Sequence, residues 1–227
     1  LKIWLIRHGM TEGNRYQRYI GVTDEPLCEE GRELLESLHI EAAAVFVSPL
    51  KRCLETAAIL FGDPKVRIID QLAECDFGEF ENKNYKELSG DPRYQAWIDS
   101  NGILAFPGGE SKDECATRNL EGFQRAVSAC IREEITEAAL VVHGGTIMNI
   151  MEQYALPKKE FYEWHVGNGC GYLVELDPVL WKKDRRNLKL LEEENSFSEE
   201  QKYDIVKTAT EQNFVPSFFY LKYTKKF

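Results

Sequence analysis

Short apolar runs alternate with amphipathic stretches along most of this chain, and this alternation restricts its fold more than any other feature. Five runs have the length and composition of strands buried on both faces: Lys2–Arg7, Ala44–Ser48, Val66–Leu72, Ala139–His143 and Gly171–Leu176. Helical patterns separate them, at Glu29–His39, Leu50–Phe61, Lys112–Glu137 and Gly144–Tyr154. The alternation predicts an α/β fold, a three-layer sandwich in which helices cover both faces of a mainly parallel central sheet.

The composition of the chain changes after residue 177. The next twenty or so residues are densely charged, and the last ones are again rich in Phe and Tyr, which polar disordered segments lack. We therefore predict a domain at residues 1–177 and a C-terminal extension at residues 178–227. We expect the extension to dock on this domain or on a second copy of the chain, as in a homodimer.

Charge and cysteine usage narrow the classes of partner. The chain has 28 Lys and Arg against 38 Asp and Glu, a net charge of −10, so nucleic acids and anionic membranes are unsuitable partners. No apolar run approaches the roughly 20 residues of a membrane helix. The six cysteines are scattered without metal-binding spacing, and the first residues are too few and too charged for a signal peptide. We expect a cytoplasmic protein without a metal or cofactor.

Two of the four histidines lie where predicted strands end, and a glycine follows each of them. His8 stands in Arg7-His8-Gly9, and His143 stands before Gly144-Gly145. Functional groups gather at the ends of strands in such folds, glycine lets backbone N–H groups approach an anion, and a helix N-terminus favours phosphate. Each motif alone also fits a structural turn. Together, and with Arg52 at the start of a predicted helix, they indicate a local anion site.

Four motifs carry a resemblance to a known family. They are Arg7-His8-Gly9, Ser48-x-x-x-Arg52-x-x-x-Thr56-Ala57, Leu72-x-Glu74-x-x-x-Gly78 and Val142-His143-Gly144. Their order and spacing resemble those of the histidine phosphatase superfamily, which includes phosphoglycerate mutases and many small phosphatases. The resemblance covers residues 2–176.

Three further motifs resemble the α-ribazole phosphatase and broad-specificity phosphatase branch of that superfamily. They are Pro26-Leu27-x-x-x-Gly31, Asp76-Phe77-Gly78-x-Phe80-Glu81 and Pro107-Gly108-Gly109-Glu110-Ser111. Met10 and Asn82 depart from the residues usual in the family, and we expect them to affect the rim of the substrate site rather than the phosphate pocket.

The resemblance implies a role for each matching residue. His8 would be the nucleophile that takes the phosphoryl group, because a neutral imidazole can attack phosphorus. Arg7 and Arg52 would bind phosphate oxygens through their planar guanidinium groups. Glu74 would protonate the departing oxygen and later deprotonate the attacking water. His143 would add a donor if it is protonated.

Two neutral groups complete this implied phosphate pocket. The side chain of Asn14 and the backbone N–H of Gly144 would donate hydrogen bonds to the phosphoryl oxygens. Preorganised donors of this kind stabilise the charge that develops during phosphoryl transfer. The expected ligand is a small phosphomonoester, with α-ribazole phosphate as the leading substrate.

Three alternatives to a phosphatase remain open. A mutase would use the same residues, but family mutases carry a longer insertion between the acid and the second histidine than separates Glu74 from His143 here. A non-catalytic binding module would keep the fold, although retention of Arg7, His8, Arg52, Glu74 and His143 together argues against it. A metal phosphatase lacks support, because no Asp and His cluster has two-metal spacing.

Overall fold

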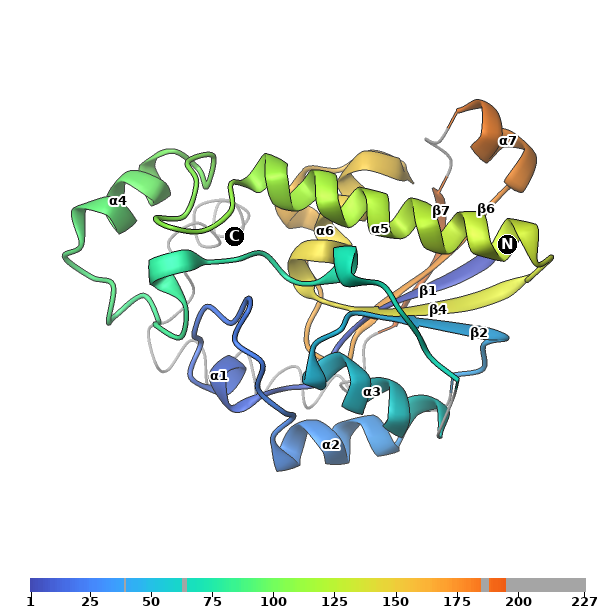
Figure 1. The fold of residues 1–227 in the computed structure, drawn as a ribbon, viewed down its shortest axis with the longest axis horizontal. Helices are drawn as coiled ribbons and strands as arrows, with labels where there is room; N and C mark the ends of the chain where they lie inside the picture. Colours follow the sequence, from blue (N-terminus) through green and yellow to red (C-terminus); the bar gives the residue numbers. More distant parts are fainter. Residues whose placement is uncertain (39, 63–64, 185–187, 195–227) are drawn as a thin grey trace, which may run out of the picture.

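The computed structural model describes residues 1–38, 40–62, 65–184 and 188–194, which form a seven-stranded sheet with helices on both faces (Figure 1). The strands are β1 (Lys2–Arg7), β2 (Ala44–Val47), β3 (Arg67–Ile68), β4 (Glu137–Val142), β5 (Ala155–Leu156), β6 (Gly171–Leu176) and β7 (Leu188–Glu194). Their order across the sheet is β3-β2-β4-β1-β6-β7-β5. The strands from β3 to β1 are parallel, whereas β6 is antiparallel to both β1 and β7. The predicted α/β fold with a mainly parallel sheet is confirmed.

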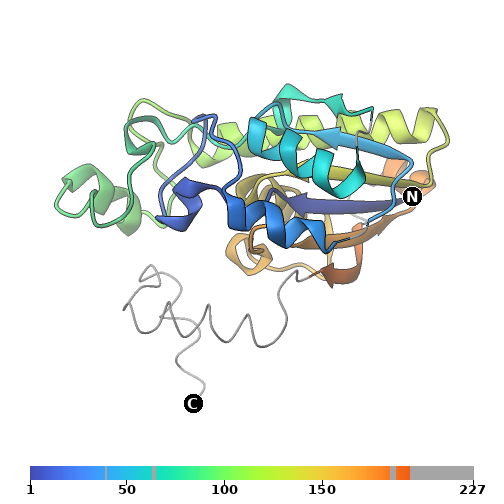
Figure 2. The ribbon, with the colours of Figure 1, turned by 90° about the horizontal axis from the view of Figure 1, so that it is seen from below.

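Helices α2 (Glu29–Glu36) and α3 (Lys51–Phe61) cover one face of the sheet, and α5 (Lys112–Arg132) and α6 (Gly144–Tyr154) cover the other (Figure 2). The period-2 geometry of a strand divides the apolar side chains between these layers. In β1, Ile3 and Leu5 pack in the core under α5 and α6, whereas Ile6 packs with α2 and α3. Strands buried on both faces thus explain the continuous apolar runs in the sequence.

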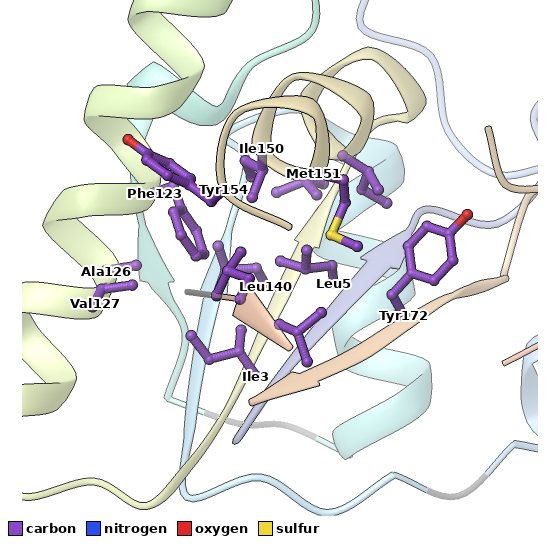
Figure 3. Packing of buried hydrophobic residues seen from close by; sticks show 14 of the residues in the cluster. Ile3, Leu5, Phe123, Ala126, Val127, Leu140, Ile150, Met151, Tyr154 and Tyr172 are labelled. Carbon is purple, nitrogen blue, oxygen red and sulfur yellow. The ribbon is translucent and has the colours of Figure 1, made fainter. Parts of the chain in front are cut away.

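The larger core lies between the sheet and helices α5 and α6 (Figure 3). Each of these elements contributes residues that are almost completely buried: Ile3, Leu5, Phe123, Ala126, Val127, Leu140, Ile150, Met151, Tyr154 and Tyr172. Burying a side chain of the size of Leu or Phe contributes about 1.5–3 kcal/mol. This packing holds β1, β4 and α6 together. His8 directly follows β1, and His143 lies between β4 and α6.

The boundaries of two predicted elements differ from those in the structure. Helix α5 begins after Ser111 with the predicted capping box, in which Ser111 and Glu114 each accept from the other's backbone N–H. It ends at Arg132, before the expected Glu137, because Glu134 takes a left-handed φ of 55° and the chain turns into β4. The predicted strand Val66–Leu72 contains only the two-residue β3, followed by a 3-10 helix at Asp70–Leu72.

Three helices were not predicted: α1 (Glu12–Arg15), α4 (Pro92–Asp99) and α7 (Pro178–Lys183). Helix α4 lies beyond one end of the sheet, at the left of Figure 1, and buries none of its residues fully. It therefore lacks the strong apolar face that would reveal it in sequence. Within the described ranges, no helix has both the length and the apolar character needed to cross a membrane.

The sheet and its core continue past residue 177, where we predicted the domain to end. Helix α7 places Trp181 in the main core with 5% exposure, and β7 pairs with β6 and buries Leu188 completely. The dense charges of this segment conceal the apolar positions, which is why the sequence suggested a boundary here. Helix α7 and strand β7 thus add to the same sheet and core, and the rest of the predicted extension, 195–227, lies outside the described residues.

Candidate active site

The two histidine motifs meet because their strands are neighbours. Strands β1 and β4 are parallel and adjacent, with Arg7 in register with Val142, so the residues that follow them lie at the same edge of the sheet. The His8 backbone N–H donates to the Val142 carbonyl at 3.0 Å. The ring centroids of His8 and His143 are 5.2 Å apart. The topology thus brings together residues that are 135 positions apart in the sequence.

His8 is held as a neutral imidazole, and among the described residues its ring is anchored through Nδ1. Its Nδ1 lies 2.7 Å from the Gly9 carbonyl, and since a carbonyl can only accept, Nδ1 carries the proton. Burial lowers the pKa of His8 well below 6.5, and the positive charges of Arg52 and Arg7 lower it further. The lone pair of Nε2 is therefore available to attack an electrophile, as the nucleophilic role requires.

Arg52 is completely buried at the start of α3 and is held on several sides. Its Nη1 donates to the Thr23 carbonyl at 2.8 Å, and its Nη2 donates to the Gly21 carbonyl at 2.8 Å and the Ile20 carbonyl at 3.3 Å. Its Nε donates to His143 Nδ1 at 3.3 Å. These contacts fix the guanidinium plane beside the two histidines.

His143 is completely buried, and both of its ring nitrogens are engaged. Since Nδ1 accepts from Arg52, Nε2 carries the proton and donates to Ser48 Oγ at 2.7 Å. Burial and the nearby charge of Arg52 lower the pKa of His143 well below 6.5, and His8 and Arg7 add to this effect. The expected role as a protonated donor therefore requires that an arriving anion change this protonation state.

Arg7 provides the clearest sign of an anion site. Its Nη1 donates to the Val166 carbonyl at 2.7 Å, but its Nε is buried without a partner among the described residues. A buried cationic donor left unpaired is destabilising unless a ligand satisfies it. A Cβ atom at Gly144 would lie 3.4 Å from this Nε, so the glycine leaves open space beside the unpaired donor.

Glu74 lies across the same space from Arg7 and is 9% exposed. Its Oε1 accepts from the Cys75 backbone N–H at 3.0 Å, and its Oε2 accepts from the Gly145 backbone N–H at 3.1 Å. A Cβ atom at Gly145 would lie only 2.5 Å from Oε1. The second glycine after His143 therefore lets the carboxylate rest against the first turn of α6.

The two neutral helpers expected from the sequence also lie at this edge. Asn14 Oδ1 accepts from Asn168 Nδ2 at 3.0 Å and from the Thr11 backbone N–H at 3.3 Å, so only its Nδ2 can donate to a ligand. Asn168 Nδ2 also contacts the His8 carbonyl at 3.2 Å. Helix α6 begins at Gly144, whose N–H has no acceptor within the helix.

Sequence reasoning did not assign roles to several residues that shape this site. Ser48 accepts from His143, and Thr56 Oγ1 accepts from the Gly9 backbone N–H at 2.9 Å. Arg52 and Thr56 are four residues apart in α3, so they lie on one helix face toward the sheet edge. The four-residue spacing in the second motif was the available signal. Asn168, by contrast, follows no pattern that sequence reasoning can use.

A cavity of about 260 Å³ opens beside Arg7 and Glu74, and six aromatic side chains contribute to its walls. The aromatic residues that line it are Tyr19, Phe77, Trp97, Phe106, Phe161 and Tyr162. His165 also lines it, and burial together with the charge of Arg7 lowers its pKa to about 4, so its ring is neutral. Lys112 at the start of α5 is paired with Glu152 at 3.5 Å, and its Nζ lies 4.1 Å from the centroid of the Phe161 ring.

Cys75, Glu110 and Cys115 form a group close enough to share one metal ion within the part of the chain that is described. Glu110 already pairs with Arg118 at 2.7 Å and accepts from the Asp76 backbone N–H at 3.0 Å. The contact with Cys115 raises the pKa of the Cys75 thiol, and burial raises it further, which favours the protonated thiol over the thiolate that binds metals. These contacts give the group a structural role beside the cavity.

Comparison with known proteins identifies the family. The model of the histidine phosphatase superfamily (branch 1) matches residues 3–189, so the chain belongs to this superfamily. It is 26% identical over 187 residues to the adenosylcobalamin/alpha-ribazole phosphatase of Escherichia coli K12, covering 78% of this chain and 91% of that protein. It is 25% identical over 189 residues to a 2,3-bisphosphoglycerate-dependent phosphoglycerate mutase of Parvibaculum lavamentivorans, with coverages of 76% and 89%.

A solved structure supports the fold. The alpha-ribazole phosphatase of Shigella flexneri superposes with a TM-score of 0.72 at 24% identity, over 86% of this chain and 97% of that one. The superfamily membership inferred from the motifs and the α/β fold predicted from the alternation of strands and helices are confirmed. The relatives include both phosphatases and mutases, so membership alone leaves the reaction open.

Proposed function

We propose that this protein hydrolyses a small phosphomonoester through a phosphohistidine on His8, and that α-ribazole 5′-phosphate is its leading substrate. Nε2 of His8 attacks phosphorus while the bond to the ester oxygen breaks, and Arg7 and Arg52 neutralise the phosphoryl oxygens. Glu74 gives its proton to the departing oxygen. In the second half-reaction Glu74 takes a proton from water, the water oxygen bonds to phosphorus, and His8 leaves as the neutral imidazole.

The proposed substrate class is supported mainly by the cavity with aromatic side chains beside Glu74 and Arg7. Glu74 has to lie against the leaving group, because it protonates that oxygen, so the cavity next to it receives the rest of the substrate. Its aromatic walls favour a flat, uncharged ring, since ring pairs gain about 0.5–1.5 kcal/mol beyond the burial of apolar area. α-Ribazole 5′-phosphate is a ribose phosphate with such a base.

The same cavity disfavours a phosphoglycerate mutase. A phosphoglycerate carries a carboxylate next to the transferred group, and burying that charge requires a free cationic partner. Among the described residues that line the cavity, the cations are Arg7 and Lys112. Arg7 faces the phosphate position, and Lys112 is already paired with Glu152. A non-catalytic binding module is also disfavoured, because binding alone would not require the free Nε2 of a neutral His8.

A substrate panel tests this proposal. Release of inorganic phosphate should be fastest, by kcat/KM, for α-ribazole 5′-phosphate among phosphoglycerates, phosphoserine, sugar phosphates and nucleotides. In the same experiment, 3-phosphoglycerate should give no 2-phosphoglycerate. Rapid interconversion of the two phosphoglycerates would identify a mutase instead, and no phosphate release from any compound would reject the enzymatic proposal.

A variant of the cavity wall separates the leaving-group site from the phosphate site. Trp97→Leu should raise KM about tenfold for substrates with an aromatic base, because one ring contact is lost. The KM for glycerol phosphate, which does not reach the wall, should be unchanged. Vanadate, which mimics five-coordinate phosphorus, should inhibit wild type and Trp97→Leu equally. An equal rise in KM for both substrates would show that this cavity does not hold the leaving group.

A further inference from the structure

Residues 20–23 form a loop between α1 and α2 that carries no helix or strand. Three of its carbonyl oxygens, from Ile20, Gly21 and Thr23, accept the hydrogen bonds that orient the Arg52 guanidinium. A loop without its own ladder of backbone hydrogen bonds depends on other groups for its shape. The orientation of the Arg52 guanidinium therefore depends on the groups that hydrogen-bond to this loop.

Glu81 holds the opposite side of the same loop. Its Oε1 accepts from the backbone N–H groups of Gly21 and Val22, each at 3.0 Å. Its Oε2 accepts from Thr23 Oγ1 at 2.7 Å and, more weakly, from the Thr23 backbone N–H at 3.4 Å. A fifth donor, the Phe77 backbone N–H, lies 3.2 Å from Oε1. In two successive peptide units, Ile20–Gly21 and Gly21–Val22, the N–H thus donates to Glu81 while the carbonyl accepts from Arg52.

The local backbone is adapted to this contact. A Cβ atom at Gly21 would lie 2.3 Å from Glu81 Oε1 and 1.9 Å from the Cys75 carbonyl, so only glycine allows the loop to pack this closely. Asn82, which replaces the glycine usual in the family, has a left-handed φ of 56° that asparagine tolerates. Its backbone N–H donates to the Tyr19 carbonyl at 2.8 Å and joins the Glu81 turn to the start of the loop.

We propose that Glu81 is a positioning residue for the phosphate site, acting on Arg52 through the loop at residues 20–23. This inference rests on the proposed function. The carboxylate attracts the N–H ends of the loop peptides and Arg52 attracts their carbonyl ends, so the two charges align the same peptide dipoles from opposite sides. Hydrogen bonds to a charged group are the stronger kind, and here they fix the guanidinium before substrate arrives.

The test replaces Glu81 by Gln. The amide keeps one acceptor oxygen but turns an NH₂ group toward backbone N–H donors, so part of the contact becomes repulsive. We expect kcat/KM to fall about tenfold to hundredfold for an alkyl phosphate and a nitrophenyl phosphate alike, since phosphate stabilisation is common to both. Glu79→Gln is the matched control. Glu79 lies two residues away, pairs with Arg93 at the surface and should leave kcat/KM unchanged.

A double-mutant cycle with Arg52→Ala distinguishes positioning from general destabilisation. If Glu81 acts through Arg52, Glu81→Gln should cause less than a twofold further loss in the Arg52→Ala background. Multiplicative losses would overturn the proposal, as would a loss confined to the alkyl phosphate. Thr23→Val removes only the 2.7 Å contact and serves if Glu81→Gln does not fold. Thr23→Val should lower kcat/KM less than Glu81→Gln does, and this loss should also disappear in the Arg52→Ala background.

Vanadate binding separates the failure of this inference from the failure of the proposed function. If the wild-type chain hydrolyses no phosphomonoester, the proposed function fails, but the cycle can still be measured by calorimetric titration with vanadate. The inference would be supported if Glu81→Gln binds vanadate more weakly than wild type, while the same substitution does not weaken vanadate binding further in the Arg52→Ala background. Unchanged binding in Glu81→Gln would overturn it.

Discussion

Gly145→Ala should displace Glu74, the proposed general acid, without weakening the fold. The added Cβ would lie 2.5 Å from Glu74 Oε1, whereas ordinary contacts begin near 3.4 Å, so the carboxylate has to retreat by about 0.9 Å. A misplacement of about 1 Å can reduce the rate of a positioned reaction by about 10²-fold. Gly145 lies in the first turn of α6 and alanine is a better helix former than glycine, so stability should be maintained.

Two substrates reveal which step the substitution affects. An alkoxide leaving group needs a proton, so kcat for an alkyl phosphate should fall by about 10²-fold in Gly145→Ala. A nitrophenolate leaves as a stable anion and should be affected much less. Glu74→Gln, which removes the acid, should show the same selectivity with a loss of about 10²–10⁴-fold.

Gly144→Ala is the comparison one residue away. The three atoms nearest to its Cβ would all belong to Arg7, with Nε at 3.4 Å, so any loss should be equal for the two substrates. Arg52→Ala should likewise lower both rates together. If Gly145→Ala slows the nitrophenyl phosphate as much as the alkyl phosphate, Glu74 is not the acid, and Asp76 becomes the next candidate.

Further predictions concern the nucleophile, the buried histidines and the last strand. His8→Ala should abolish the acid-labile, alkali-stable label that wild type acquires from labelled substrate; a label of the opposite stability would reject phosphohistidine. Because the pKa of both His8 and His143 is far below 6.5 in the folded chain, the unfolded chain binds more protons below that pH. The free energy of unfolding should therefore fall as pH drops below about 6.5, by up to about 1.4 kcal/mol per unit for each histidine, and His143→Gln should reduce this slope in urea titrations. Leu188→Ala should lower the free energy of unfolding by about 2–5 kcal/mol. Leu191 is 40% exposed on the same strand, so Leu191→Ala should lower it much less; equal losses of stability would contradict the packing of β7.

The α/β architecture and the residues that the structure brings together at the sheet edge could both be predicted from sequence patterns. The apolar runs at β1, β2, β4 and β6 are continuous because these strands are buried on both faces, and such runs can be recognised in the sequence alone. The glycine after each strand-end histidine and the spacing from Ser48 to Thr56 could also be recognised in the sequence, but for a different reason. Each reflects a local requirement of backbone geometry or helix periodicity.

The contacts among these groups could not be predicted from the sequence. The tautomer of His8, the pairing of His143 with Arg52 and Ser48, and the unpaired Nε of Arg7 depend on groups brought together from distant parts of the chain. The place of β7 in the sheet was equally hidden, because its charged residues mask the few positions that pack. Sequence patterns record which side chains need burial or a special φ, whereas hydrogen bonding and protonation depend on which neighbours the fold supplies.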